Sequence, residues 1–422
     1  MPEYLHFGAG NIGRALAGPL FSRAGYRVVF VDAVPSIVAA LQQRKRYRVV
    51  VKDTIPAGES ETFEVCGVDG ISVEDAEAVR QAVARADLIG TAVGAAHLPD
   101  VLTAIASGLP LRNGRPVSIL FCENLNGLSV MAREVLTRAL PPGFLMDRVG
   151  LVETSIGKMV PLMPAEVRER DPLEVWGEAY NVIIADRNGF AGPVPEGVEG
   201  LELKSCFQAY VERKLYIHNL GHATCACHGF LRGHTRICEA MADAAVVAET
   251  RQVMQVSARA LIRRYPSEFS EANQTAHVED LLRRFGNRAL GDTVFRVGRD
   301  LPRKLAPGDR FIGGLRLAQA EGEDPAPVCR AIAAALHFAA VDETGHLFPA
   351  DAAFRERLAR EGAEALLSAH SGLDPIRDRE ALNLILGELK PEVNHPAQRA
   401  NSSRATDNTF STVNPKWRAR SL

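Results

Sequence analysis

An amine, a carboxamide and an imidazole lie within nine residues of one another in the segment 211–227, whose sequence is VERKLYIHNLGHATCAC. They belong to Lys214, Asn219 and His222. A lysine whose charged form is disfavoured by burial can take a proton from a substrate hydroxyl, and an amide can hydrogen-bond the oxygen that gains charge. The imidazole could orient the same oxygen or tune the lysine. The segment is therefore a candidate for moving one proton at one oxygen.

The geometry of a helix determines whether these side chains can meet. At about 100° per residue on an α-helix, Asn219 and His222 fall one turn apart, and Lys214 projects within roughly 140° of both. The three could then line one side of a cleft, with Lys214 as general base. The alternative is a solvated lysine on an amphipathic helix, because a trio at this spacing also arises by chance.

The same stretch offers metal ligands as a second alternative. Zinc takes cysteine and histidine side chains, and five cluster here: His222, Cys225, Cys227, His228 and His234. Cys225 and Cys227 are separated by one residue, rather than by the two to four usual for a zinc-binding pair. On a helix their sulfurs would point about 200° apart. We therefore predict no metal.

A glycine-rich turn near the N-terminus predicts a dinucleotide site. A strand expected at 4–7 leads into GAGNIGR, and a helix expected at 14–21 would point its N-terminus at a pyrophosphate. Asp32 ends the next strand, 27–31, where an acid would accept the ribose hydroxyls. Its carboxylate would repel a 2′-phosphate, so the motif favours NAD over NADP. The loop residues in question are Gly8, Ala9, Gly10, Asn11, Ile12 and Gly13.

Strand-like and helix-like segments alternate after this motif, which predicts a doubly wound parallel sheet with helices on both faces. Ligands bind beyond the carboxyl ends of such strands. This places Thr91, Gly94 and Asn124 on the rim of the cofactor cleft. Asn124 could hold a substrate oxygen or, alternatively, bond the local backbone of a turn. The expected strands are 87–93, 117–122, 148–154 and 182–185, and the expected helices are 74–85, 101–107 and 130–140.

A Gly- and Pro-rich stretch at 189–200 separates this region from one with helical periodicity. We predict a Rossmann-type α/β domain at residues 1–195 and a mainly α-helical domain at residues 196–390. Residues 391–422 are rich in Pro, Asn, Ser, Thr and Arg, which predicts a disordered tail. Helices of the second domain are expected at 240–264, 278–285, 328–338, 352–361, 362–368 and 379–386.

The composition of the 422 residues is typical of a globular protein, with 46% hydrophobic and 24% charged residues. A net charge of −2 gives no global attraction to nucleic acid or to an anionic membrane. No apolar run approaches the roughly 20 residues of a membrane span, and we expect no signal peptide. Seven scattered cysteines do not form a disulfide framework, so we expect a reducing, cytoplasmic compartment.

With these motifs in this order, the sequence resembles the polyol-specific long-chain dehydrogenases/reductases, which form the mannitol dehydrogenase family. The resemblance covers about residues 4–386. The family's K-x4-N-x2-H signature falls on Lys214, Asn219 and His222. The matching motifs are LHFGAGNIGR at Leu5, TAVG at Thr91, CEN at Cys122, DPLEV at Asp171, YVERKLYIHNLGHA at Tyr210 and RVGRDLPRKLAPGDRFI at Arg296.

The resemblance implies a metal-independent, NAD-linked oxidation of a polyol phosphate, in which mannitol 1-phosphate loses a hydride from C5 and gives fructose 6-phosphate. It implies that Lys214 is the general acid/base, that Asn219 and Asn124 stabilise the oxyanion, and that His222 contacts the reacting oxygen. It also implies an acid near the end of the last strand of the first domain, which would hold substrate hydroxyls. Asp186 is the match for this acid.

A phosphorylated substrate requires cations, and the sequence offers a basic cluster: Arg296, Arg299, Arg303, Lys304 and Arg310. Arginine side chains suit phosphate oxygens because they can bond two of them at once. The alternative is a solvated or internally paired basic loop. If no cations line the cleft, the substrate would be a free polyol or a hexuronate. A further alternative is a non-catalytic NAD-binding protein, in which Lys214 would be solvated.

Overall fold

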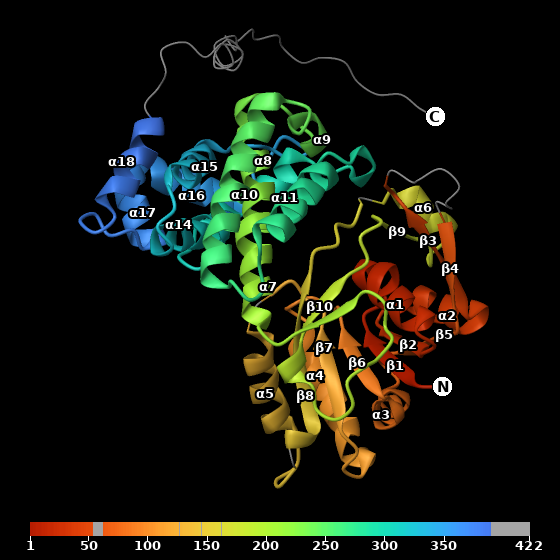
Figure 1. Ribbon diagram of the computed structural model, residues 1–422. Helices are drawn as coiled ribbons and strands as arrows, with labels where there is room; N and C mark the ends of the chain where they lie inside the picture. Colours follow the sequence, from red (N-terminus) through yellow and green to blue (C-terminus); the bar gives the residue numbers. More distant parts are fainter. Residues whose placement is uncertain (54–61, 126, 145, 162, 390–422) are drawn as a thin grey trace, which may run out of the picture.

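The computed structural model describes residues 1–53, 62–125, 127–144, 146–161 and 163–389. Within these ranges an eight-stranded sheet occupies one end of the molecule and a group of helices the other (Figure 1). The fold class predicted from the sequence, a Rossmann-type sheet followed by helices, is confirmed. The tail predicted at 391–422 lies outside the described residues.

The strand order of the main sheet is β11-β10-β8-β7-β6-β1-β2-β5. From β8 to β5 every neighbouring pair is parallel. Every residue of β1, β6 and β7 is buried, as expected for parallel strands that are covered on both faces. The bounds are β1 Glu3–Phe7, β2 Arg27–Asp32, β5 Val68–Ser72, β6 Leu88–Thr91, β7 Val117–Phe121, β8 Val149–Ile156, β10 Ile183–Asp186 and β11 Leu201–Lys204.

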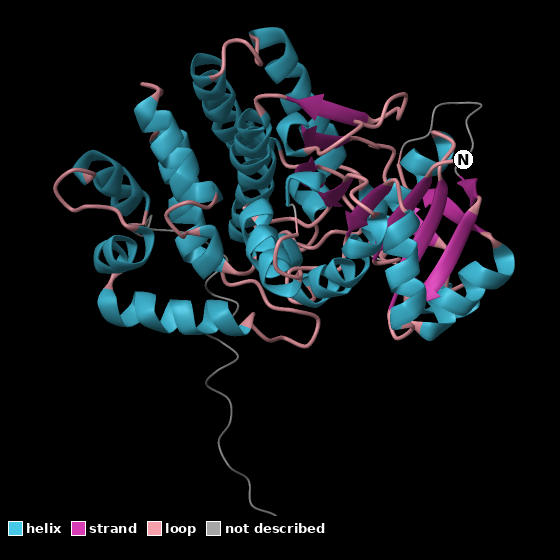
Figure 2. Cartoon of the chain, turned by 90° about the horizontal axis from the view of Figure 1, so that it is seen from below, coloured by secondary structure: helices cyan, strands magenta, loops and turns pink. Residues whose placement is uncertain are grey.

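Helices cover the two faces of this sheet (Figure 2). Apolar side chains of α3 (Ala76–Arg85), α4 (Leu98–Gly108) and α5 (Leu128–Ala139) form one core with Leu5 and Phe7 of β1. On the opposite face, α1 (Gly18–Arg23) and α2 (Pro35–Arg44) pack on Tyr4 and Phe30. Alternate side chains of β1 therefore belong to two separate cores, one on each face of the sheet.

Strand β10 departs from the parallel sheet that the sequence predicts. It runs antiparallel to β8, with Ile183 opposite Ile156 and Ala185 opposite Thr154. The strand therefore starts beside Ile156, the last residue of β8, and runs back along β8 to Asp186. β11 pairs with β10 beyond the boundary predicted after residue 195, so the sheet extends to Lys204. The domain limits given above stay predictions.

A second, three-stranded sheet with the order β4-β3-β9 lies beside the main one. The sequence analysis did not predict it. Its strands are short or partly exposed, and β9 contains only three residues, so they carry little periodic signal. The bounds are β3 Arg46–Val51, β4 Thr62–Cys66 and β9 Val175–Gly177.

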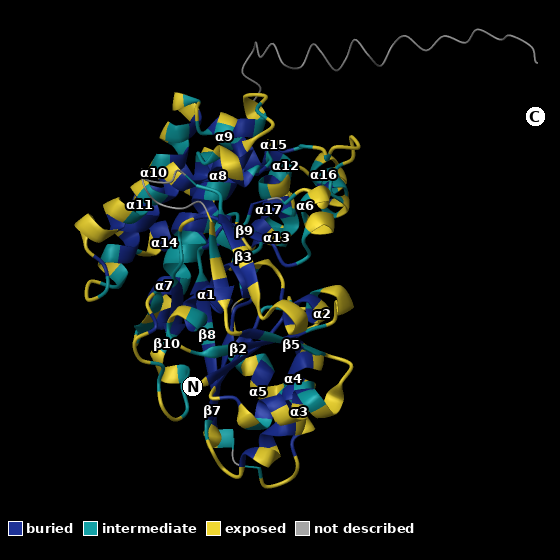
Figure 3. Cartoon of the chain, turned by 90° about the vertical axis from the view of Figure 1, so that its right-hand side faces the viewer, coloured by how far each residue is buried: buried dark blue, intermediate teal, exposed yellow. Residues whose placement is uncertain are grey.

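The helical half is built around α10 (Ala244–Arg264), which buries Val253, Met254 and Leu261. This helix packs against α8 (Leu220–Leu231), which lies beside it in Figure 3. The helix predicted at 240–264 begins at Ala244, because the Asp243 carboxylate accepts a bond from the Ala245 amide and caps it. No helix in the described ranges is long and apolar enough to cross a membrane. The other helices are α7 Phe207–Arg213, α9 Ile237–Ala240, α11 Glu271–Phe285, α12 Val294–Gly298, α13 Leu301–Lys304, α14 Arg310–Ala320, α15 Ala326–His337, α16 Pro349–Glu361, α17 Ala363–Ser371 and α18 Arg379–Glu388.

Candidate active site between the sheet and the helices

A cavity of about 420 Å³ lies between the carboxyl edge of the sheet and the helical half. A second cavity of about 580 Å³ shares Asn124, Lys158, Met159 and Asn219 with it and extends toward the basic cluster. The first cavity brings together residues from both halves: Asn11, Ile12, Ala92, Gly94, Cys122, Glu123, Asn124, Ile156, Gly157, Lys158, Met159, Lys214, His218 and Asn219.

The glycine-rich loop has the close contacts that its sequence predicts. Gly8 has a φ of +97°, and a Cβ there would lie 2.5 Å from the Ala92 carbonyl oxygen. A Cβ on Gly13 would lie 2.2 Å from the Gly8 oxygen. Gly10 is exposed and has no atom within 4 Å of its Cβ position, so its backbone is open to a ligand. Asn11 and Ile12 face the cavity. These residues fit a bound dinucleotide.

Asp32 lies directly beside this loop. Its carboxylate accepts bonds from the Ala9 amide at 2.6 Å and from the Val34 amide at 2.8 Å. The side chain is partly exposed. The acid therefore fixes the loop and remains near enough to solvent to accept ribose hydroxyls.

Thr91 and Gly94 differ in their relation to the cavity. Gly94 lines it. Thr91 is fully buried, and its hydroxyl donates to the Glu123 carboxylate at 2.8 Å. The same carboxylate accepts from the Val93 amide at 3.1 Å, and burial raises its pKa. Thr91 thus supports the cavity wall through Glu123, rather than forming the rim as the sequence analysis expected.

A π-helical turn at Lys214–Asn219 connects α7 to α8. The Leu220 amide donates to the Leu215 carbonyl, which is the bond from residue i+5 to residue i that defines this geometry. Residues five apart therefore stand one turn apart, and Lys214 and Asn219 both face the first cavity. The α-helical geometry assumed from the sequence is wrong for this turn, but the predicted proximity of the two side chains is present.

The amine of Lys214 donates to the side-chain oxygen of Asn124, which follows strand β7. This bond joins the helical half to the sheet and leaves the Asn124 NH₂ group available to a substrate oxygen. Burial, aided by the nearby guanidinium of Arg310, lowers the pKa of Lys214 from 10.5 to about 8. About a tenth of the amine is then neutral at pH 7, far more than at the ordinary pKa of a lysine, and this neutral form can act as a general base.

His222 lies against the ring of Phe285, with the ring centroids 4.5 Å apart and the planes 6° apart. Burial, with a smaller contribution from Arg296, lowers its pKa to about 3, so the imidazole is neutral. Its buried Nε2 has no hydrogen-bond partner among the described residues. The side chain lines the second cavity together with Asn219.

The predicted basic cluster lines this second cavity, but most of its cations have acidic partners. Arg296 pairs with Asp292, Arg303 with Asp300 at 2.5 Å, and Arg310 with Asp309 at 2.8 Å. Lys158 joins the five basic side chains of the cluster in the lining, and Asp292 and Asp300 are the carboxylates that line the cavity with them. The cavity thus keeps a positive potential.

Two of these cations differ from the rest. Lys304 is buried and donates to the Arg299 carbonyl oxygen, which fixes the intervening loop. Burial, together with Arg310, lowers its pKa to about 8. Arg299 is exposed and contacts the rings of Phe295 and Phe348 at 5.5 and 5.3 Å. It has no carboxylate partner in the part of the chain that the structure describes.

Asp186 is not brought to the cleft. This acid ends β10, where it caps a short 3-10 helix by accepting from the Asn188 amide at 2.9 Å. It does not line the cavities that contain Lys214. The prediction that Asp186 holds substrate hydroxyls has no support in this geometry.

The cysteine and histidine cluster does not converge. Cys225 and Cys227 are fully buried in the helical core, and burial raises the pKa of both thiols. His234 bonds the Asp243 carboxylate at 3.1 Å. In the described part of the chain no three His, Cys, Asp or Glu side chains are arranged to hold a metal ion.

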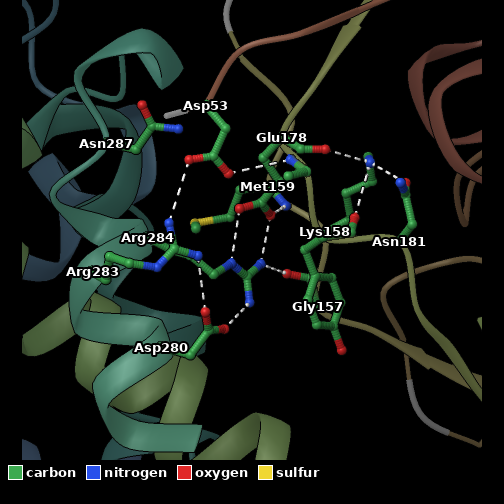
Figure 4. A network of polar contacts seen from close by, with 12 residues as sticks. Asp53, Gly157, Lys158, Met159, Glu178, Asn181, Asp280, Arg283, Arg284 and Asn287 are labelled. Carbon is green, nitrogen blue, oxygen red and sulfur yellow. Dashed lines mark hydrogen bonds and ion pairs between the residues drawn. The ribbon is translucent and has the colours of Figure 1, made fainter. Parts of the chain in front are cut away.

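The sequence analysis missed two cleft residues, Lys158 and His218. Lys158 follows β8, is buried, and donates to the Glu178 and Tyr180 carbonyls and to Asn181 (Figure 4). Burial lowers its pKa to about 7. His218 is buried one turn after Lys214, and burial, aided by Arg284, lowers its pKa. The GKMVP segment and the extra histidine before Asn219 were the available signals.

Comparison with known proteins gives matches in both halves. Residues 2–196 match the family model described as the Mannitol dehydrogenase Rossmann domain, and residues 207–383 match the Mannitol dehydrogenase C-terminal domain.

Two solved structures resemble the chain over most of its length. A D-sorbitol dehydrogenase in substrate-free form is 17% identical, with 92% of each chain covered and a TM-score of 0.74. The Pseudomonas fluorescens mannitol 2-dehydrogenase, in a ternary complex with NAD and D-mannitol, is 18% identical, with 92% of this chain and 95% of that chain covered and a TM-score of 0.66. At these identities the likeness is one of fold.

We expect the amine of Lys214 to titrate near pH 8, because burial disfavours its charged form. Competitive acetylation with a trace of acetic anhydride between pH 6 and pH 11, quantified by peptide mass spectrometry, measures this pKa against N-acetyl-lysine. The variant Arg310→Leu should raise it, since a neighbouring cation is removed. A midpoint near 10.5 in the unaltered protein would contradict the burial argument.

Proposed function

Since this chain belongs to the mannitol dehydrogenase family, we propose that it is an NAD-dependent oxidoreductase that interconverts D-mannitol 1-phosphate and D-fructose 6-phosphate. The proposal has two parts: the reaction is the oxidation of a polyol at a CH–OH group, and the polyol carries a phosphate. The observation that carries it is the contact between Lys214 and Asn124, which joins the two halves beside the glycine-rich loop.

In the direction of oxidation, neutral Lys214 takes the proton of the substrate hydroxyl while Asn124 and Asn219 donate to the oxygen from the two sides of the cavity. Bound NAD⁺ would accept the hydride from the carbon that bears this oxygen. His222 remains neutral and offers one ring nitrogen to the same oxygen. In the reverse direction, protonated Lys214 returns the proton to the carbonyl oxygen.

The second cavity supports the phosphate. Its net positive charge suits a dianion at the end of the substrate away from Lys214, and so does the guanidinium of Arg299, which has no carboxylate partner among the described residues. The rings of Phe295 and Phe348 lie near the guanidinium and leave its charge in place. We therefore favour a phosphorylated substrate.

A second candidate is a dehydrogenase of free polyols. It is favoured by the two structural neighbours, which are named for D-sorbitol and for mannitol and of which one holds D-mannitol. Under this alternative the acids Asp292, Asp300 and Asp309 neutralise enough of the basic cluster for a neutral substrate to bind.

A comparison of a phosphorylated ketose with the corresponding free ketose distinguishes the two candidate functions. We expect kcat/KM with NADH to be higher for fructose 6-phosphate than for fructose. With fructose 6-phosphate as substrate, kcat/KM should also be higher with NADH than with NADPH.

The variant Lys214→Ala should lower kcat by about 10² to 10⁴, the usual cost of one acid/base group, while NADH still binds. A preference for fructose would establish the free-polyol alternative, and NADH binding without turnover of either ketose would point to the non-catalytic reading.

The cofactor preference should depend on the charge of Asp32. We expect Asp32→Asn to weaken NADH binding by about tenfold and to strengthen NADPH binding, because a ribose acceptor and a repulsive charge are lost together. Fluorescence titration of the reduced cofactors measures both. Asp69→Asn is the control, since Asp69 lies on the neighbouring strand β5 and pairs with Arg27 and Lys45 instead of the loop. An unchanged ratio of the NADH and NADPH dissociation constants in Asp32→Asn would show that Asp32 does not set the cofactor preference.

Arg299 should distinguish phosphorylated from free substrates. We expect Arg299→Met to raise the KM for fructose 6-phosphate about 10- to 100-fold, because a hydrogen bond between charged groups contributes roughly 1.5–3 kcal/mol. Any activity with fructose should be unaffected. Arg288→Met serves as control, since Arg288 is an exposed arginine outside the two cavities. Equal effects of the two variants would argue against a phosphate at Arg299.

A further inference from the structure

We propose that the last two residues of α11, Arg284 and Phe285, form a positioning element that docks the helical half on the sheet and sets the orientation of His222. This role rests on the function proposed above. Neither residue belongs to the K-x4-N-x2-H motif, and neither lines the cavity that holds Lys214 and Asn124. Both would act through other residues.

Arg284 is the largest of the almost completely buried side chains among the described residues. Its guanidinium donates to both carboxylate oxygens of Glu178, at 2.8 and 2.5 Å, and to the Gly157 carbonyl oxygen at 2.6 Å (Figure 4). It also lies 4.2 Å from the ring centroid of Tyr180. Glu178 is equally buried, so the pair is shielded from water. One side chain of the helical half thus holds two separate loops that extend from the sheets.

These two loops are also bonded to each other. The Glu178 carboxylate accepts from the Met159 amide, and the Lys158 amine donates to the Glu178 carbonyl at 2.7 Å. Lys158 reaches further along the second loop, to Asn181 at 2.6 Å. Lys158 and Met159 in turn line both cavities. Arg284 therefore fixes a loop pair that forms one wall of the cleft.

The next residue, Phe285, contacts the histidines of α8 and the π-helical turn. Its ring is stacked on His222, as described above, and lies 5.6 Å from the ring of His218. A flat aromatic contact of this kind fixes the plane of the imidazole. The position of α11 then determines where His222 directs its free Nε2.

The two contacts are consecutive in sequence, and this makes them mechanically dependent. A displacement of Arg284 from Glu178 moves the end of α11, and the Phe285 ring moves with it. The geometry of His222 is therefore linked to the docking of the two halves. A merely structural pair would affect folding but would leave the His222 ring where it is in the folded protein.

The matched substitutions are Phe285→Leu and Phe269→Leu. Both remove a buried aromatic ring from the same core, but Phe269 packs on Tyr210 and Tyr265 and has no ring contact with a histidine in the described part of the chain. We expect Phe285→Leu to lower kcat at least tenfold, while the KM and the NADH dissociation constant change less than threefold. Phe269→Leu should leave kcat within twofold. Equal losses of kcat in the two variants would overturn the role of Phe285.

The docking pair is tested with Arg284→Lys, which keeps the charge but cannot bond both carboxylate oxygens and the Gly157 carbonyl, and with Glu178→Gln. Arg283→Met is the control, because Arg283 is the exposed neighbour and contacts Asp53 at 3.4 Å. A second readout is the Hε1 resonance of His222 in protein labelled at histidine, assigned with His222→Gln. This resonance carries the ring-current shift of Phe285 and requires no turnover.

We expect Arg284→Lys and Glu178→Gln to shift the His222 resonance toward its position in Phe285→Leu, and Arg283→Met to leave it unchanged. The variant Glu178→Gln/Phe285→Leu should lose less kcat than the product of its single effects, because both act on the same ring. An unmoved His222 resonance in both docking variants would overturn the proposal, even if wild-type protein proved to act on another substrate. Absence of turnover by wild-type protein with every polyol and ketose would instead contradict the proposed function.

Discussion

The site depends on one constraint: an amine must be buried enough to lose its proton and still lie beside a hydrogen-bond partner. Lys214 meets both conditions because it projects from the helical half against Asn124 at the end of β7. Neither half could do this alone, since the sheet supplies the amide and the helices supply the lysine. The docking of the two halves is therefore part of the chemistry, and the buried pair of Arg284 and Glu178 lies where that docking is most shielded from water.

Features that follow from local sequence were predictable. Gly8 and Gly13 are needed where backbone atoms approach too closely for a side chain, and the structure has both contacts. Asp32 and Asn124 follow from topology, because Asp32 ends β2 and Asn124 lies three residues after the end of β7, so both belong to the carboxyl edge. The helical periodicity of the second half similarly predicted α10 and α15 within a few residues.

Features that depend on contacts between distant segments were not predictable. The amino-acid sequence of residues 214–219 does not distinguish an α-helix from a π-helix. The extra residue of the π-helical turn depends on packing against the rest of the protein. The direction of β10 is set by its pairing with β8, which no local pattern in residues 182–185 indicates. Lys158, Glu178 and Arg284 each look like ordinary surface residues in the sequence, because a buried ionic network is recognised only when its partners are known.

The distribution of charge in the cleft explains how the pKa of one lysine is lowered. Around Lys214, Asn124 and Asn219 supply dipoles, and the neighbouring Lys158 has a pKa lowered to about 7. The cations are gathered at the other end, where three acids hold most of them. Their residual positive charge opposes protonation of Lys214, and the same charge would attract an anionic group on the substrate. Binding of such a group would neutralise that field and make Lys214 more basic at the moment when it must accept a proton. A free polyol would bring no such charge, so the same cluster would then serve only to lower the pKa of the lysine.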